Sequence, residues 1–206
     1  MCKLFDLTGK IAIVTGASTG LGQGMSIGLA EAGANLVLVD YVEMSETENI
    51  ISSLGRDYIS LKLDLMNKES IDIIVNETKK KFGTIDILVN NAGIIRRAPA
   101  IEFSEKDWDD VMYLNSKVVF FLSQAVAKIM IPNKRGKIIN IASMLSFQGG
   151  IIVPSYSASK GAVAQITKAL ANEWAQYGIN VNAIAPGYMA TNNTANIRKD
   201  PERFKS

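Results

Sequence analysis

Histidine is absent from this chain, and cysteine occurs once, at Cys2. A single cysteine cannot form a disulfide bond within the chain, and without histidine the sequence offers no Cys/His cluster for a metal ion. We therefore expect no metal site. The low cysteine content fits a reducing compartment, so we expect a cytoplasmic protein.

Long hydrophobic runs are also missing. Residues 1–6 lack the apolar segment of a signal peptide, and the most apolar span, 118–131, is interrupted by Ser123, Gln124 and Lys128. We therefore expect neither secretion nor a membrane span. Neither sign of charge is in large excess: 22 basic and 20 acidic residues give a formal net charge of +2. Nothing in this balance points to nucleic acid or an anionic membrane as a partner.

What the sequence does contain is an alternation of short apolar runs with helical patterns. A chain of 206 residues with 48% apolar content predicts one domain, 1–206, with an ample core. Strands are expected at 11–15, 36–39, 59–63, 85–89, 138–142 and 179–184, and helices after the first strand and over 44–54, 70–82, 104–130 and 156–174. This order predicts an α/β fold, a Rossmann-like doubly wound parallel sheet flanked by helices on both faces.

Glycines gather directly after the first apolar run. Gly16, Gly20 and Gly22 lie between that run and a helical pattern that reaches Leu29 and Ala30. A glycine turn at this place lets the backbone approach a pyrophosphate, whose charge then meets unpaired amides at the start of the helix. A purely structural turn has the same composition, so the turn alone leaves that alternative open.

The second apolar run ends at Asp40, eighteen residues after Gly22. A carboxylate at this place can accept hydrogen bonds from the adenosine ribose hydroxyls and would repel a 2′-phosphate, so Asp40 favours NAD over NADP. No arginine or lysine lies between Thr15 and Asp40 to hold such a phosphate. The alternative is that aspartate simply favours turns after strands.

Small polar residues follow the fourth apolar run. Asn91, Ala92 and Gly93 lie where the carboxyl ends of parallel strands line a ligand crevice, so we expect them to face the cofactor rather than to form a plain turn. Arg96 and Arg97 come directly afterwards. Two guanidinium groups at the rim of a site suit a substrate carboxylate, although arginines on loops are commonly just solvated.

The chemistry is expected between the fifth apolar run and the helix that follows it. Tyr156 and Lys160 are four residues apart, so on a helix they lie on one face, about one turn from each other. A fixed ammonium beside a phenol stabilises the phenolate and lowers its pKa from about 10. Ser143, just past the strand, can hydrogen-bond the oxygen that gains or loses the proton. The alternative is an ordinary surface pair of tyrosine and lysine.

Asn115 is a polar side chain in an otherwise core-like helix, between Leu114 and Ser116. A buried amide is costly unless it is hydrogen-bonded. We expect it either to bind a water that leads protons from Lys160 or to make a simple hydrogen bond in the core.

Two helices carry more apolar surface than one face of a sheet can cover. Apolar residues occur on nearly all sides of 118–131, and the helix that contains Val163, Ile166, Leu170 and Trp174 is similar. We infer a homo-oligomer packed through these two helices.

Together these features resemble the short-chain dehydrogenase/reductase family over the whole chain. The matching motifs, in order, are the glycine turn 16–22, Asn91-Ala92-Gly93, Asn115, Ser143, Tyr156, Lys160 and the turn at Pro186 and Gly187. The resemblance implies a nicotinamide cofactor, hydride transfer between that cofactor and a carbon of the substrate, and a tetramer for full-length members.

The resemblance also implies a role for each residue. Tyr156 is expected to be the general acid/base, and Ser143 to position the substrate oxygen. Lys160 is expected to lower the pKa of Tyr156 and to bind the nicotinamide ribose, and Asn115 to hold a relay water. The residues expected to bind NAD are Gly16, Ser18, Thr19, Gly20, Leu21, Gly22, Asp40, Asp64, Leu65, Asn91, Ala92, Gly93, Tyr156, Lys160, Pro186, Gly187, Met189 and Thr191. Those expected at the substrate are Ser143, Tyr156, Arg96, Arg97 and Gln148.

Three segments, 90–97, 142–150 and 185–194, resemble more closely the family members that act on small sugar acids. The resemblance then implies a sugar-acid substrate, which gives Arg96 and Arg97 a carboxylate to meet. A related reductase of the same family, or an inactive nucleotide-binding module, are the alternatives.

The carboxyl terminus departs from the family pattern. Family members continue through another helix and a seventh strand, which this chain is expected to lack, so the sixth strand would be an open edge. Residues 200–204 begin like a capped helix with proline at its first position, but too few residues follow for a stable helix.

Overall fold

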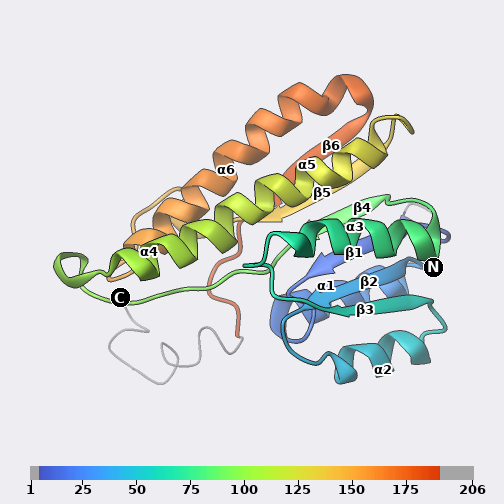
Figure 1. Ribbon diagram of the computed structural model, residues 1–206, viewed down its shortest axis with the longest axis horizontal. Coiled ribbons are helices and arrows are strands. Elements are labelled where there is room, and N and C mark those ends of the chain that lie inside the picture. Colours follow the sequence, from blue (N-terminus) through green and yellow to red (C-terminus); the bar gives the residue numbers. More distant parts are fainter. Residues whose placement is uncertain (1–4, 191–206) are drawn as a thin grey trace.

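A six-stranded parallel sheet forms the centre of the computed structural model, which describes residues 5–190 (Figure 1). The strands are β1 (Ile11–Thr15), β2 (Asn35–Asp40), β3 (Tyr58–Lys62), β4 (Ile87–Asn90), β5 (Gly136–Ile141) and β6 (Ile179–Ile184). Their order across the sheet is β3-β2-β1-β4-β5-β6, and every neighbouring pair is parallel. The Rossmann-like fold predicted from the sequence is therefore confirmed, and its strand order reverses between β1 and β4, the place where such folds bind ligands.

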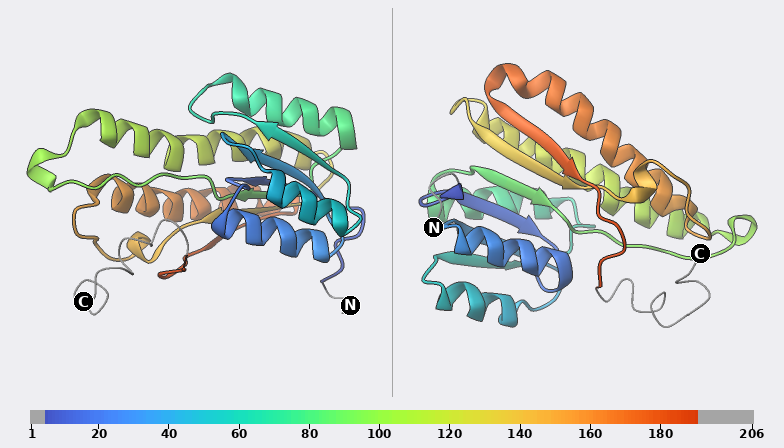
Figure 2. Two further views of the ribbon diagram at one scale, coloured as in Figure 1. Left: turned by 90° about the horizontal axis from the view of Figure 1, so that it is seen from below. Right: turned by 180° about the vertical axis from the view of Figure 1, so that it is seen from behind.

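Helices cover both faces of the sheet (Figure 2). They are α1 (Gly20–Glu31), α2 (Ser45–Ser53), α3 (Glu69–Phe82), α4 (Glu105–Met112), α5 (Val118–Met130) and α6 (Pro154–Trp174). The helices pack into two separate apolar cores. Helices α1 and α2 contribute to one core, and α3, α5 and α6 contribute to the other.

The strands β1 to β5 supply side chains to both cores, because successive residues of a strand point to opposite faces, whereas β6 contributes only to the core of α3, α5 and α6. In β2, Leu36 and Leu38 pack with the layer of α1 and α2. Val37 and Val39, which alternate with them, pack with the layer of α3, α5 and α6. All four side chains are fully buried. This burial on both faces explains why β2 is a continuous apolar run in the sequence.

The long helix expected over 104–130 is interrupted by a π-helical turn at Tyr113–Lys117, between α4 and α5. Its start agrees with the prediction, since the Ser104 hydroxyl accepts a hydrogen bond from the Asp107 N–H at 3.1 Å. The π turn inserts extra backbone into an otherwise regular helix, and such turns are frequent at functional sites. Here the turn contains the buried side chains of Asn115 and Ser116.

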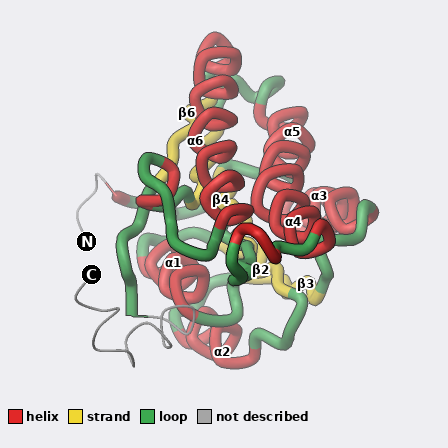
Figure 3. The backbone as a smooth tube through the Cα atoms, turned by 90° about the vertical axis from the view of Figure 1, so that its left-hand side faces the viewer, coloured by secondary structure: helices red, strands yellow, loops and turns green. Residues whose placement is uncertain are grey.

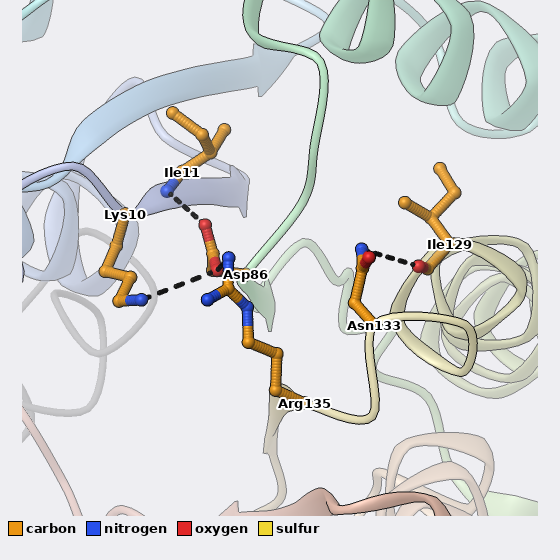
Figure 4. A network of polar contacts seen from close by, with 6 residues as sticks. All are labelled: Lys10, Ile11, Asp86, Ile129, Asn133 and Arg135. Carbon is orange, nitrogen blue, oxygen red and sulfur yellow. Dashed lines mark hydrogen bonds and ion pairs between the residues drawn. The ribbon is translucent and has the colours of Figure 1, made fainter.

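Asp86, directly before β4, links the amino ends of β1, β4 and β5 (Figure 4). Its carboxylate accepts a hydrogen bond from the Ile11 N–H at 3.1 Å and lies 3.3 Å from the Arg135 guanidinium and 3.8 Å from the Lys10 ammonium. The Lys137 N–H also donates to the Asp86 carbonyl. A buried carboxylate held by two cations fixes the edge of the sheet that lies opposite the expected site.

Helices α5 and α6 lie side by side and extend beyond the sheet (Figures 1 and 3). A groove of about 540 Å³ runs along the outside of α4, the π turn and α5, and Ile166 of α6 also lines it. Phe121 lines this groove and is 42% exposed. Within residues 5–190, no helix is long and apolar enough to cross a membrane.

Candidate active site

Ser143, Tyr156 and Lys160 come together at the carboxyl edge of β5. Ser143 follows the strand and begins a short 3₁₀ turn at Met144–Ser146, with its hydroxyl accepting a hydrogen bond from the Leu145 N–H at 3.1 Å. Tyr156 lies in the first turn of α6, and its side chain forms a hydrogen bond with Ser143. Ser143 and Tyr156 therefore converge on one site, where both side chains can meet a substrate oxygen that gains or loses a proton.

Lys160 lies one turn further along α6 and is 5% exposed. Its ammonium donates a hydrogen bond to the Ile141 carbonyl at 2.5 Å and lies 5.6 Å from the centre of the Tyr156 ring. Burial disfavours the charged form and lowers the pKa of Lys160 to about 8. The carbonyl at the end of β5 therefore fixes the Lys160 ammonium 5.6 Å from the centre of the Tyr156 ring.

The pKa of Tyr156 departs from the sequence-based expectation. Burial is the largest influence and raises the pKa of Tyr156 above its usual value. The hydrogen bond from Ser143 and the positive charge of Arg97 oppose this rise. Lys160 is not among the groups that shift the pKa of Tyr156 here, and its ammonium is directed to the Ile141 carbonyl, so its expected effect on the phenol stays a prediction.

The two arginines after β4 have different surroundings, although the sequence suggests one role for both. The Arg96 guanidinium is paired with the Asp107 carboxylate of α4 at 3.3 Å. Arg97 instead acts electrostatically on the phenol of Tyr156. Of the pair, Arg97 is the cation whose charge influences the pKa of Tyr156.

Asn115 projects from the π turn toward the loop after β4. Its side-chain oxygen accepts from the Ile94 N–H at 2.9 Å, and its amide donates to the Ile94 carbonyl at 2.9 Å and to the Ser159 hydroxyl at 3.1 Å. These bonds satisfy a side chain that is 1% exposed. They correspond to the core hydrogen bonds left open as one alternative, and they hold α6 and the loop together.

The glycine turn between β1 and α1 has the tight backbone geometry that its sequence predicts. Gly16 and Gly20 have positive φ angles, 70° and 60°. A Cβ atom on Gly22 would lie 1.9 Å from the Gly16 carbonyl oxygen, so only glycine fits there. Thr19, at the N-cap of α1, makes no side-chain cap, which leaves the first amides of the helix available to an anion.

Five of the residues predicted to bind the cofactor line one cleft of about 50 Å³: Gly16, Asp40, Asp64, Leu65 and Ala92. They come from the ends of β1, β2, β3 and β4, so the cleft lies at the reversal of strand order. A cleft between a glycine turn and a buried carboxylate has the position that the adenosine half of a dinucleotide takes in such folds.

Asp40 and Asn91 also hold the glycine turn in place. The Asp40 carboxylate accepts from the Ser18 N–H at 3.0 Å and from the Tyr41 N–H at 2.8 Å. The Asn91 amide donates to the carbonyls of Thr15 and Gly16, at 3.0 Å and 3.1 Å. The side chain of Asn91 is therefore directed to the glycine turn, so it would act on the cofactor through the shape of that turn.

The remaining predicted residues lie around the opening of the site. The Pro186 carbonyl accepts from the Met144 N–H, which attaches the turn after β6 to the turn that carries Ser143. Gly187, Met189 and Gln148 are exposed. Thr191 and the helix start expected at 200–204 lie outside the described residues.

Two positions were missed by the sequence reasoning. The Thr47 hydroxyl of α2 is fully buried and donates to the Ala17 carbonyl of the glycine turn at 2.9 Å. The Ser146 hydroxyl donates to the Lys160 carbonyl at 2.6 Å. Ser146 stands three residues after Ser143, the spacing of a capping box, and this was the available signal. No local pattern marks Thr47, whose partner is thirty residues away.

Comparison with known proteins agrees with this geometry. A model of the short chain dehydrogenase family matches residues 10–202. The chain belongs to the short-chain dehydrogenase family. It is therefore an oxidoreductase of the kind that acts on CH–OH groups, and the site described above occupies the residues that the family motifs pointed to.

Several members of the short-chain dehydrogenase family are similar over nearly the whole chain. The 2-dehydro-3-deoxy-D-gluconate 5-dehydrogenase of Escherichia coli strain K12 is 60% identical over 200 residues, which are 97% of this chain and 79% of that protein. Gluconate 5-dehydrogenase of Gluconobacter oxydans is 42% identical over 97% of this chain and 78% of its own length. The crystal structure of a putative 2-deoxy-D-gluconate 3-dehydrogenase from Agrobacterium tumefaciens, with bound NADP, is 52% identical, with a TM-score of 0.90 over 98% of this chain and 81% of that chain.

Proposed function

We propose that this protein is an NAD-dependent dehydrogenase that transfers a hydride between the cofactor and a secondary alcohol or ketone of a small sugar acid, 2-dehydro-3-deoxy-D-gluconate above all. The observation that carries the proposal is the convergence of Ser143, Tyr156 and Lys160 at the carboxyl edge of β5, where Ser143 and Arg97 both act on the pKa of Tyr156. The names of the similar proteins support this choice of substrate.

Proton handling in this proposal uses three side chains. In the oxidation direction, the substrate hydroxyl gives its proton to the ionised oxygen of Tyr156, while the Ser143 hydroxyl donates a hydrogen bond to the substrate oxygen. The Lys160 ammonium stabilises negative charge at the carboxyl edge of β5. A bound nicotinamide would supply the hydride acceptor for the substrate carbon. Reduction runs through the same groups with the proton moving from Tyr156 to the substrate.

Binding of the dinucleotide is assigned to the glycine turn and the cleft beside it. The amides at the start of α1 would meet the pyrophosphate, and the Asp40 carboxylate would accept hydrogen bonds from the ribose hydroxyls. Both oxygens of Asp40 already accept backbone N–H groups, which holds the carboxylate in one orientation. A fixed negative charge there disfavours a 2′-phosphate, so we propose NAD over NADP, although the similar Agrobacterium tumefaciens protein is described with NADP.

Recognition of the substrate carboxylate is assigned to Arg97. The charge of Arg97 lowers the pKa of Tyr156, and a guanidinium can hold a carboxylate by a bidentate pair. Arg96 is held by Asp107 and is assigned a structural role. Gln148, exposed on the loop after the 3₁₀ turn, is proposed to contact the substrate hydroxyls.

The alternatives within the family are gluconate 5-dehydrogenase, which the Gluconobacter oxydans protein supports, and 3-oxoacyl carrier-protein reductase. A third alternative is an inactive nucleotide-binding module. Turnover of 2-dehydro-3-deoxy-D-gluconate, gluconate and acyl thioesters, each with NAD(H) and NADP(H), separates all three. Binding of NADH without turnover of any substrate would favour the inactive module.

The decisive variant is Tyr156→Phe. It keeps the ring and removes only the oxygen that exchanges the proton, so turnover should fall by about 1,000-fold or more while NADH binding stays within about twofold. Rates and a fluorescence titration of NADH measure the two effects. Retained turnover would exclude Tyr156 as the acid/base.

The two arginines give a matched test of the substrate class. Arg97→Met should raise KM for the sugar acid by about tenfold or more, because it removes the cation that meets the carboxylate. Arg96→Met is the control and should leave KM within about threefold. An uncharged amide of the same sugar acid should show no difference between wild type and Arg97→Met. Equal effects of the two variants would remove the assignment.

We further propose a cytoplasmic protein that assembles through α5 and α6. The single cysteine supports the location. The partly exposed Phe121 and the groove beside it support the assembly, because apolar grooves of this size commonly mark contacts between copies.

A further inference from the structure

Ser146 connects the backbones of two proposed catalytic residues. Its hydroxyl oxygen accepts a hydrogen bond from the Ser143 N–H at 3.3 Å, and its hydroxyl proton is donated to the Lys160 carbonyl at 2.6 Å. A serine hydroxyl has one proton to donate and lone pairs to accept, so both bonds can exist together. The link joins the end of β5 to α6 across fourteen residues of sequence.

The first of these bonds is an ordinary local cap. Ser143 and Ser146 form a capping box around the 3₁₀ turn, in which each side chain satisfies the backbone of the other end. The turn in turn presents the Leu145 N–H to the Ser143 hydroxyl oxygen at 3.1 Å. With that oxygen occupied as an acceptor from one side, the hydroxyl proton is left for the Tyr156 oxygen.

The second bond is not explained by capping. The Lys160 carbonyl lies inside α6, where the helix already supplies a backbone donor, so no cap is needed there. A hydroxyl added to this carbonyl fixes where α6 lies relative to the 3₁₀ turn. Lys160 and Tyr156 share that helix and Ser143 begins that turn, so the bond fixes the distance between phenol and serine.

We propose that Ser146 is a positioning residue that holds Ser143 and α6 in register, so that the Ser143 hydroxyl donates to the oxygen of Tyr156. This inference rests on the proposed function for its kinetic consequences, but the contact that it describes can be measured without any substrate. Ser146 itself touches neither the substrate nor the cofactor in this assignment.

The inference makes the ionisation of Tyr156 depend on Ser146. Two groups act on the pKa of this phenol, Ser143 from the end of β5 and Arg97 from the loop after β4. The Lys160 ammonium, on the next turn of α6, lies 5.6 Å from the centre of the ring. The hydrogen bond from Ser143 lowers the pKa of Tyr156. Ser146→Ala should loosen the 3₁₀ turn and weaken only the hydrogen bond from Ser143 to Tyr156. The midpoint of the Tyr156 titration should therefore rise by about half a unit to one unit of pH.

The experiment compares the ultraviolet titration of the phenol in wild type, Ser146→Ala and Ser146→Thr, each after subtraction of the same background carrying Tyr156→Phe. Subtraction isolates Tyr156 from the other tyrosines. Ser146→Thr keeps a hydroxyl and should titrate as wild type does. Thr78→Val is the structural control, because it removes a buried hydrogen bond of the same 2.6 Å length to a carbonyl of α3, far from the site.

Kinetics with the sugar acid provide the second readout. Ser146→Ala should lower kcat by about tenfold and move the rise of the oxidation rate to higher pH, while KM for NAD stays within about twofold. An unshifted titration in Ser146→Ala, or an equal shift in Thr78→Val, overturns the inference. If wild type turns over no substrate, the proposed function fails, whereas the phenol titration still decides the role of Ser146.

Discussion

A buried lysine in the active site lowers the stability of the folded chain. The pKa of Lys160 falls from 10.5 to about 8 on folding, because burial disfavours its charge. Between these values the unfolded chain binds the proton more tightly, so stability falls as the pH drops from 10.5 toward 8. Below about 8 the penalty is fully present. A catalytic cation in this place is therefore kept at the expense of stability.

Lys160→Met tests that balance. Methionine fills similar space without charge, so the free energy of unfolding near neutral pH should rise by about 1 to 3 kcal/mol while turnover is lost. Urea unfolding near neutral pH measures the gain, and the same experiment above pH 10.5 is the control, since the lysine is then neutral in both states. A variant that is less stable than wild type near neutral pH would contradict this reading.

At the scale of single residues, the sequence could indicate which side chains carry the chemistry, but not which other side chains lie around them. The spacing of Tyr156 and Lys160 was enough to place them one turn apart on a helix. Nothing local distinguished Arg96 from Arg97, because the choice depends on Asp107, which belongs to a different element. The pKa of Tyr156 was misjudged for the same reason: burial and the direction of the Lys160 ammonium are properties of the folded chain.

At the scale of elements, the glycine turn and α1 form one unit whose glycines are not equivalent. Gly22 faces the Gly16 carbonyl at a distance that excludes a side chain, whereas a Cβ atom on Gly24 would meet nothing within 4 Å. Both lie in α1, where alanine favours the helix by roughly 0.5 to 1 kcal/mol over glycine. Their replacement by alanine should therefore have opposite results.

We expect Gly22→Ala to weaken NADH binding by about tenfold or more, because the backbone of Gly16 must move and the turn loses its shape. Gly24→Ala should bind NADH as wild type does and unfold at a slightly higher temperature. A fluorescence titration and a thermal melt of each variant provide the comparison. Equal binding by the two variants would mean that the shape of the turn does not control the cofactor.

Element types were predictable where periodicity is local, and their interruptions were not. The strands β1, β2 and β4 are continuous apolar runs because they are buried on both faces, and this left a clear signal. The π turn at Tyr113–Lys117 left none, since one extra residue barely disturbs a helical pattern and its cause lies in contacts of Asn115 with Ile94 and Ser159. The interruption depends on tertiary hydrogen bonds that the sequence does not display.

At the scale of the whole molecule, the alternation of strands and helices predicted a doubly wound parallel sheet with helices on both faces, because parallel strands need crossovers and these have one hand. The order of the strands and the face that each helix covers come from the structure. Which helix surfaces remain uncovered was inferred only from excess apolar content in 118–131. In the structure that excess is concentrated in the groove along α4, the π turn and α5, which includes Phe120 and Phe121.

The groove leads to a prediction about assembly. If copies of the chain pack through α5 and α6, an aspartate at Phe121 must be buried against apolar surface, which costs several kcal/mol at each contact. Phe121→Asp should therefore convert the oligomer to a smaller species. Ile73→Asp is the matched control, because Ile73 is 39% exposed on α3, close to the 42% of Phe121, but lies outside the groove.

Sedimentation velocity of the three proteins over a range of concentrations measures this directly. Wild type and Ile73→Asp should sediment as the same oligomer, and Phe121→Asp should sediment more slowly with an unchanged circular dichroism spectrum. Since the same helices carry Asn115, Tyr156 and Lys160, dissociation should also lower turnover in proportion to the fraction of smaller species. A wild-type protein that is monomeric at every concentration, or a Phe121→Asp variant that sediments as wild type does, would place the contact between copies elsewhere or remove it.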